Sequence, residues 1–500
     1  MDQKTNIAAL NEAARRFISK RGKLLIDGKW EDAASGKTFD VIDPATEEVI
    51  CKVAEGGKED IDRATRAARK AFDDSAWSRM TPAGRERLLL KLADLVEANA
   101  DELAQLESLN NGKLVMYARM VDVQGTIDFL RYMAGWATKI SGQTLDVSIG
   151  IPNTEFQAFT LRQPVGVCGQ IVPWNFPLAI AAWKLGPALA TGCTCILKPA
   201  EQTPLTALRL GELILEAGFP PGVVNIVTGF GETAGAALVD HPMVDKISFT
   251  GSTEVGKLIG RACMTSMKRV SLELGGKSPV IVADDVDPAM AIPGAANAIF
   301  FNQGEVCTAG SRLYIADKLF DKVVSGIADI AKGTKLGAGT DPSSQMGPLV
   351  SKEQFDRVLG YIDRGRKEGG EVVAGGQRHG NKGYFVQPTV FTKVGPSATI
   401  MREEIFGPVV VASPFKSVDD IAAIANDTSY GLAASIWSSN LGFAHRLAKR
   451  IKAGTVWVNC HNLIDPNLPF GGFKQSGIGR ENGPAAIHTY TEEKTVLMSI

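Results

Sequence analysis

The feature that most constrains this chain is the alternation of short β-rich runs with helical stretches over residues 164–274. The runs are VGVCGQIV, CTCILK, VVNIV, KISFT and RVSLEL, and glycine or proline ends the helical stretches between them. Strands that alternate with helices at this spacing form βαβ units, whose crossovers make neighbouring strands parallel. The pattern therefore predicts an α/β fold built on a doubly wound parallel sheet.

A second alternation begins after Lys277. Its β-rich runs are PVIVAD, SRLYIAD, PVVVASPF, ASIWSS and GTVWVNC. A chain of 500 residues is long enough for about two or three domains. We therefore predict a second α/β lobe.

Residues 143–162 differ from both lobes. Two runs with alternating polar residues, TLDVSIG and FQAFTLR, flank an Ile-Pro-Asn turn region. The segment predicts a β-hairpin that projects from the first lobe. Because an exposed hairpin must either protect its edges or pair with another chain, we expect a homodimer or a homotetramer.

Charge and hydropathy narrow the classes of partner. The chain has 54 Lys and Arg against 55 Asp and Glu, which gives no reason to expect nucleic acid or an anionic membrane as a partner. Its longest apolar stretch, at 176–190, contains Lys184 and Pro187 and is shorter than the ~20 residues of a membrane span. No secretory signal is visible, and seven cysteines without paired spacing indicate reduced thiols. We expect a cytoplasmic protein.

Two segments come close to a P-loop. Residues 251–257 have the Gly-x4-Gly-Lys spacing after a predicted strand, but Leu258 stands where the magnesium-binding Ser or Thr belongs. Gly276-Lys277-Ser278 has Ser271 in place of the first glycine. A P-loop phosphotransferase is therefore a poor fit that stays open as an alternative.

A dinucleotide site is a further alternative. Gly229-Phe-Gly231-Glu-Thr-Ala-Gly235 follows VVNIV and opens a helix, with one residue more than the usual Gly-x-Gly-x-x-Gly. The helix N-termini after Thr250 and Gly229 could each bind a pyrophosphate through free N–H groups and the helix dipole. Plain strand-to-helix turns explain these glycines equally well.

One cysteine stands out from the other six. Cys307 lies between Gly304 and Gly310, where a ligand can approach the backbone closely. From this window alone, a buried structural cysteine is the simpler interpretation. Cys193 and Cys195 alternate along a predicted strand without partners at zinc spacing, so we expect core packing there and predict no metal site.

Three motifs together change this interpretation. The chain carries FFNQGEVC at 300–307, LELGGK at 272–277 and PWNFP at 173–177. In this combination it resembles the NAD(P)-dependent aldehyde dehydrogenase superfamily, and the resemblance covers essentially the whole chain. Further matches in order are KPAE at 198–201, FTGS at 249–252, EEIFGP at 403–408 and PFGG at 469–472. The resemblance implies a variant Rossmann lobe that binds NAD through the Phe-Thr-Gly-Ser turn.

The resemblance also implies a domain division. The NAD-binding domain would comprise residues 1–140 and 163–273, and the catalytic domain residues 274–478. Residues 141–162 and 479–500 would form the oligomerisation segment.

The family's catalytic residues correspond to Cys307 as nucleophile, Glu273 as general base and Asn175 as side-chain donor to the oxyanion. Thiolate addition makes the aldehyde carbon tetrahedral, so that it can release hydride and become a thioester. Water activated by Glu273 then releases the acid, whereas a relative that passes its acyl group to coenzyme A needs no such base. Lys184 and Glu481 correspond to a possible proton-relay pair, with an ordinary ion pair as the alternative.

For the cofactor, the resemblance implies NAD. Lys198 and Glu201 match positions that contact the adenosine ribose, and the carboxylate would repel a 2′-phosphate. Ser252 matches a pyrophosphate contact, and Glu404 with Phe406 a clamp on the nicotinamide ribose. The full set of expected cofactor residues is Trp174, Lys198, Glu201, Gly231, Phe249, Gly251, Ser252, Glu404 and Phe406.

For the substrate, the tunnel positions implied by the family are occupied by Phe176, Trp183, Phe301 and Phe470. They favour a bulky uncharged aldehyde, although aromatic residues could also surround the cation of betaine aldehyde. Glu305 and Val306, just before the nucleophile, supply no cation for a carboxylate tail.

The run at 457–470 is similar to that of bacterial phenylacetaldehyde dehydrogenases. We therefore expect phenylacetaldehyde to be oxidised to phenylacetate in aromatic catabolism. The alternatives are a broad-range aliphatic or retinal-type aldehyde dehydrogenase and a catalytically silent relative.

Overall fold

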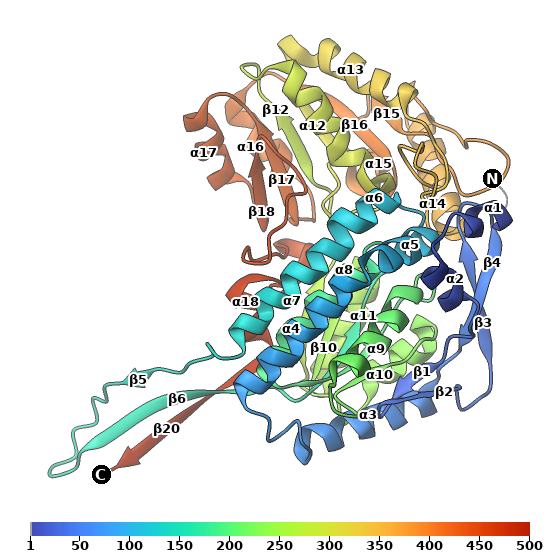
Figure 1. The fold of residues 1–500 in the computed structure, drawn as a ribbon. Helices are drawn as coiled ribbons and strands as arrows, with labels where there is room; N and C mark the ends of the chain where they lie inside the picture. Colours follow the sequence, from blue (N-terminus) through green and yellow to red (C-terminus); the bar gives the residue numbers. More distant parts are fainter. Residues whose placement is uncertain (1–2) are drawn as a thin grey trace.

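In the computed structural model, which describes residues 3–500, two α/β lobes lie one above the other and a β-arm projects from the lower lobe (Figure 1). The lower lobe holds an eight-stranded sheet in the order β19-β11-β10-β7-β8-β9-β1-β2. Its strands are β1 (Leu24–Ile26), β2 (Lys29–Glu31), β7 (Val167–Ile171), β8 (Thr194–Lys198), β9 (Val224–Ile226), β10 (Lys246–Thr250), β11 (Arg269–Glu273) and β19 (Gly477–Ile478). The five central strands from β11 to β9 are parallel, which confirms the predicted α/β class.

The upper lobe holds a seven-stranded sheet in the order β14-β15-β16-β13-β12-β17-β18. Its strands are β12 (Pro279–Val282), β13 (Arg312–Ala316), β14 (Glu371–Ala374), β15 (Thr389–Thr392), β16 (Val409–Phe415), β17 (Ala433–Trp437) and β18 (Thr455–Val458). All neighbouring pairs are parallel except β14 and β15. The second α/β lobe is therefore present, while the domain boundaries given above stay a prediction.

The projecting arm is the predicted hairpin with one strand more. Strand β5 (Thr144–Leu145) pairs antiparallel with β6 (Phe156–Pro164), as the alternating runs predicted. The sequence pattern missed the third strand, β20 (Thr491–Ser499), which pairs with β6 along its full length. A separate two-stranded sheet joins β3 (Thr38–Asp43) to β4 (Glu48–Ala54).

Helices cover both sheets. They are α1 (Gln3–Ala8), α2 (Glu12–Ile18), α3 (Lys58–Asp73), α4 (Pro82–Ala98), α5 (Ala100–Asn111), α6 (Val115–Tyr117), α7 (Gln124–Trp136), α8 (Pro177–Thr191), α9 (Leu205–Ala217), α10 (Ala236–Asp240), α11 (Thr253–Thr265), α12 (Pro288–Phe300), α13 (Phe320–Gly333), α14 (Lys352–Lys367), α15 (Thr399–Arg402), α16 (Val418–Asn426), α17 (Leu441–Arg450) and α18 (Gly483–Thr489). Within residues 3–500, no helix is long and apolar enough to cross a membrane.

Helix α8 lies at the centre of the lower lobe. Nearly all of its residues are buried, because its alanine-rich sequence lets α7 and α4 pack closely against it. Cys195 in β8 and Cys193 just before it are fully buried, which confirms the prediction of core packing. Since β7, β8, β10 and β11 are parallel, their carboxyl ends meet at one edge of the sheet, and the loops that follow them face the upper lobe.

Candidate active site

A tight backbone turn places Cys307 between the lobes. Helix α12 ends at Phe300, and Asn302, Gln303 and Gly304 then adopt left-handed φ angles of 48°, 57° and 71°. A Cβ at Gly304 would lie 2.2 Å from the Gly407 carbonyl oxygen, so only glycine fits there. The turn reverses the chain within four residues and directs Cys307 into the cavity described below.

Asn175 is fixed against the same loop. Its Nδ2 donates to the Glu305 carbonyl oxygen at 2.9 Å, which uses one of the two amide hydrogens and leaves the other for a ligand. The Glu305 carboxylate turns away from the cavity and accepts a hydrogen bond from the Val350 N–H at 3.0 Å. Val306 lines the cavity and Glu305 does not, so of these two residues only Val306 could contact a molecule bound there.

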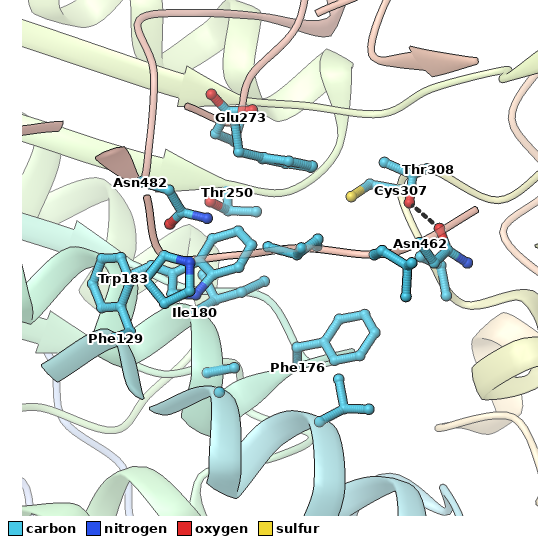
Figure 2. Close-up of a pocket in the computed structure, with 18 of the residues that line it drawn as sticks. Phe129, Phe176, Ile180, Trp183, Thr250, Glu273, Cys307, Thr308, Asn462 and Asn482 are labelled. Atoms are coloured by element: carbon cyan, nitrogen blue, oxygen red, sulfur yellow. Dashed lines mark hydrogen bonds between the residues drawn. The ribbon is translucent and has the colours of Figure 1, made fainter. Parts of the chain in front are cut away.

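Glu273 is the last residue of β11 and lines the same cavity as Cys307 (Figure 2). Within the described residues, neither of its carboxylate oxygens has a hydrogen-bond partner. Burial, together with the nearby charge of Glu481, raises its pKa well above the usual value. A carboxyl group with a raised pKa and no fixed partner is suited to exchanging protons near neutral pH.

The thiol of Cys307 is held in its protonated form. Burial first, and then the carboxylates of Glu404 and Glu273, raise its pKa to about 12, while the N–H groups of Thr308 and of Cys307 itself act in the opposite direction. Cys307 therefore rests as a thiol at neutral pH, and it would have to lose its proton before it could react as a nucleophile.

Lys184 and Glu481 form an ion pair inside the protein. Lys184 Nζ lies 2.8 Å from Glu481 Oε1 and donates to Ser248 Oγ at 3.0 Å, and both charged residues are buried. Because the charge of Glu481 acts on Glu273, the pair lies within electrostatic reach of the carboxyl group in the cavity.

The cavity has a volume of about 300 Å³. Phe176 stacks on Phe301 with ring centroids 6.3 Å apart, and Trp183 contacts Phe470 at 5.4 Å. All four aromatic residues expected from the sequence line it, together with Cys307 and Glu273. Figure 2 shows Phe176 and Trp183 on the side opposite Glu273.

Sequence reasoning missed a wall of this cavity that comes from α7 and the turn before it. Val121, Gly125, Asp128 and Phe129 recur at helical spacing and all line the cavity. Phe129 also contacts Trp183, with centroids 6.3 Å apart. The periodicity could have identified a buried helix face, but it does not distinguish a face against a cavity from a face against the core.

A segment of the upper lobe closes the cavity on the other side. Asn462 Oδ1 accepts a hydrogen bond from Thr308 Oγ1 at 2.7 Å (Figure 2). Leu463 and Ile464 also line the cavity. His461 lies behind this segment, with Nε2 2.9 Å from the Thr308 carbonyl oxygen and Nδ1 3.0 Å from Ser435 Oγ. Thr308, the residue after Cys307, is therefore hydrogen-bonded to the run at 457–470.

The expected cofactor residues follow the strand ends of the lower sheet. Lys198, the last residue of β8, is buried and lies 3.0 Å from Glu201. Ser252 follows β10 and is the N-cap of α11, with its Oγ accepting from the Val255 N–H. Around the Cα of Gly231, at the start of the π-helical turn 231–235, the space is open.

Three further expected cofactor residues come from the loops between the lobes. Glu404 Oε1 accepts a hydrogen bond from the Gly276 N–H at 2.8 Å, and burial raises the pKa of Glu404 to about 7. Phe406 meets Trp174 edge to face, with centroids 5.1 Å apart.

The second P-loop candidate is wrong, because residues 276–278 lead into strand β12 and not into a helix.

The fold and the site define an oxidoreductase-type protein, in which a thiol, a carboxyl group and an amide donor lie beside the carboxyl ends of a Rossmann-like sheet. The family model described as the aldehyde dehydrogenase family matches residues 30–496, and the chain belongs to this family.

The relatives agree in length with this chain. It is 52% identical to phenylacetaldehyde dehydrogenase of Pseudomonas fluorescens, over 95% of this chain and 96% of the relative. It is 50% identical to human aldehyde dehydrogenase 1A1, over 96% and 95% of the two chains. The solved structure of an aldehyde dehydrogenase from Bacillus cereus in complex with NAD⁺ has a TM-score of 0.96 at 51% identity and covers 98% of this chain and 99% of that one. The resemblance predicted from the motifs is confirmed.

Proposed function

We propose that this protein is an NAD-dependent aldehyde dehydrogenase that releases a free carboxylic acid and prefers an uncharged aromatic aldehyde. The observation that carries the proposal is that Cys307, Glu273 and four aromatic side chains line one cavity, with Asn175 bound to the loop that holds the thiol.

In the first half of the reaction, Cys307 adds to the aldehyde carbon and forms a thiohemiacetal. Negative charge then develops on the former carbonyl oxygen. The free amide hydrogen of Asn175 and the backbone N–H of Cys307 are the donors available to stabilise it. Because Glu305 fixes the Asn175 amide in advance, little reorganisation is needed as the charge develops.

NAD, when bound, supplies the hydride acceptor that makes this addition an oxidation. The residues present fit the group: Ser252 caps a helix whose N–H groups can bind a phosphate, and the space around Gly231 lets the backbone approach it. Lys198 with Glu201 can bind the ribose hydroxyls, and Glu404 with Phe406 can orient the nicotinamide end. Phe249, near the end of β10, and Trp174 and Gly251, in the loops that follow β7 and β10, complete this side.

In the second half, Glu273 takes a proton from water, which attacks the thioester on Cys307 and releases the acid. The oxygens of Glu273 lack fixed partners and so are free to bind that water. We assign the Lys184–Glu481 pair to the passage of the proton away from Glu273, since Glu481 is electrostatically coupled to it.

Glu201 is expected to set a preference for NAD over NADP. Its carboxylate would face the 2′-phosphate, and two like charges near a protein surface repel by on the order of 1–4 kcal/mol. We expect Glu201→Gln to narrow the ratio of kcat/KM values for the two cofactors by about tenfold. Glu216→Gln, an exposed carboxylate on α9, is the matched control and should leave the ratio unchanged. A wild-type enzyme that prefers NADP would contradict the assignment.

The lining of the cavity supports an uncharged substrate. Among the residues described, no lysine or arginine lines it, and the exposed Asp128 lies at its edge. An aldehyde with a carboxylate tail would find no cation there and would be repelled by Asp128. The aromatic pairs can instead pack edge to face or offset against an aryl ring.

Phenylacetaldehyde is therefore the substrate that we expect to be preferred. Burial of its ring should increase kcat/KM by roughly ten- to a hundredfold over a small aldehyde, since ~1.5–3 kcal/mol is gained and each 1.36 kcal/mol is tenfold. Trp183→Leu should lower kcat/KM for phenylacetaldehyde about two- to tenfold and leave that for acetaldehyde nearly unchanged. The measurement is NADH absorbance across a series of aldehydes.

A broad-range alkyl or retinal-type enzyme is the second candidate, and Gly125 favours it. A Cβ at this position would meet nothing within 4 Å, so the cavity is open on that side. The aldehyde series separates the two candidates. A kcat/KM that rises steadily through decanal and leaves phenylacetaldehyde near acetaldehyde would refute the aryl preference while keeping the aldehyde dehydrogenase chemistry.

We also propose that the β-arm is the oligomerisation element. Strand β20 lies at the edge of its three-stranded sheet, and apolar residues are exposed on the arm, among them Leu161 and Leu497. Such an edge favours pairing with another copy of the chain in a dimer or tetramer.

A further inference from the structure

The last residue of α5 and the turn after it are hydrogen-bonded to the loop that carries Asn175. Asn111 Nδ2 donates to the Trp174 carbonyl oxygen at 3.0 Å, and Lys113 Nζ donates to the Asn175 carbonyl oxygen at 2.8 Å. Both side chains are almost completely buried. The two bonds fix the peptide planes on either side of the Asn175 Cα, and so they fix the direction in which its side chain leaves the backbone.

The charge of Lys113 is balanced within the same cluster. Its ammonium lies 2.8 Å from Asp122 Oδ1 and 3.7 Å from Glu107 Oε1. Burial, and next the charge of Asp122, raise the pKa of Glu107 above its usual value. Asp122 is the closer carboxylate and forms the ion pair with Lys113, while Glu107 accepts from the Leu178 N–H in the first turn of α8.

The same ammonium also contacts a side chain that lines the cavity. Lys113 Nζ lies 4.3 Å from the centroid of the Phe176 ring, within the range of a cation–π interaction. One buried lysine thus touches the backbone of the proposed oxyanion donor and the ring of the next residue, which lines the cavity. Burial of a charge costs free energy, and well-packed apolar residues often stabilise a core at least as much as an ion pair does. The stability of the fold alone therefore does not explain why a lysine is buried at position 113.

We propose that Asn111 and Lys113 are positioning residues that orient Asn175 for attack on the aldehyde. The inference rests on the oxyanion role of Asn175 proposed above. Both residues act through the backbone carbonyls of 174–175, and neither touches the reacting atoms. A displacement of about 1 Å in a catalytic group can lower a rate about a hundredfold, so anchors of this kind affect the chemical step directly.

The main test variant is Lys113→Met/Asp122→Asn, which removes both charges of the ion pair together. The readout is the rate constant of NADH formation in the first turnover, measured by stopped flow with NAD and aldehyde. We expect it to fall about ten- to a hundredfold, with Kd for NAD and Tm close to wild type. Lys268→Met is the matched control, because this buried lysine also donates to a backbone carbonyl, that of Val239, and should leave the rate unchanged.

A double-mutant cycle with Asn175→Ala separates positioning from a merely structural role. If the anchors act through the Asn175 side chain, the Lys113→Met/Asp122→Asn change should lower the first-turnover rate less than about threefold in the Asn175→Ala background. Equal losses of the first-turnover rate in the wild-type and Asn175→Ala backgrounds would overturn the inference. It would also be overturned if Lys113→Met/Asp122→Asn kept the wild-type rate while Asn175→Ala was slow. An Asn175→Ala enzyme at full speed would instead remove the oxyanion role itself, and the inference with it.

If Lys113→Met/Asp122→Asn does not fold, Asn111→Ala can be measured in its place, because it changes no charge. It removes the bond to the Trp174 carbonyl and is expected to slow the first turnover several-fold, with the same loss of effect in the Asn175→Ala background. A rate equal to wild type in a folded Asn111→Ala enzyme would overturn the role of that anchor.

Discussion

Replacement of Cys307 with alanine is expected to abolish aldehyde oxidation while NAD binding survives. Without the thiol, the aldehyde carbon cannot become a tetrahedral adduct on the enzyme, and no thioester can form. Removal of the nucleophile from an enzyme that works through a covalent intermediate costs on the order of 10⁴-fold or more in turnover. The measurements are NADH absorbance and a titration of NAD by calorimetry. Cys51→Ala, at a half-buried cysteine on β4, is the control that should remain fully active.

The state of the thiol gives a second check on this assignment. Because the pKa of Cys307 is raised to about 12, its thiolate fraction is small at neutral pH and grows about tenfold per pH unit. Alkylation of Cys307 by iodoacetamide in the free enzyme should therefore speed up steadily from pH 7 to pH 9. The Cys307→Ala protein measures the background from the other cysteines. Retention of more than a few per cent of wild-type turnover by the alanine variant would remove Cys307 from its role.

The parallel order of the central strands could be predicted from the sequence because each β-rich run is short, apolar and separated from the next by a helix. Lys198, Ser252 and Glu273 end or follow such strands, so their meeting at one sheet edge followed from topology alone. The role of Cys307 did not follow in this way. Its window is also compatible with a buried structural cysteine, and only the motif resemblance distinguished the two.

Other parts of the site depend on tertiary contacts without a local pattern. Strand β20 is exposed along most of its length and forms because β6 offers a free edge. The carboxylate of Glu305 accepts a hydrogen bond from Val350, which is 45 residues away in the chain. The residues next to Glu305 in the sequence do not indicate this contact. Lys113 looks like a surface residue in a polar Asn-Asn-Gly-Lys run, yet it is buried beside Asp122 and Asn175.

Glu273→Gln is expected to separate the two halves of the reaction. Loss of the carboxylate should slow hydrolysis of the thioester about 10²–10⁴-fold, the usual contribution of a general base. The first turnover needs no water, so NADH should appear as a burst of about one equivalent per active site and then stop. Intact-mass spectrometry should find the enzyme with one acyl group attached, and digestion should place that group on Cys307.

The pH dependence of the same variant tests whether Glu273 itself is the base. Burial and the charge of Glu481 raise the pKa of Glu273, so the carboxylate that accepts a proton is present above that pKa and lost as the pH falls through it. Wild-type turnover should therefore rise with pH on the acid side, and the glutamine variant should lack this rise. A variant that turns over normally would assign the base to another group. If the burst of NADH were lost as well, Glu273 would act earlier, in removing the proton from Cys307, whose pKa its charge already influences.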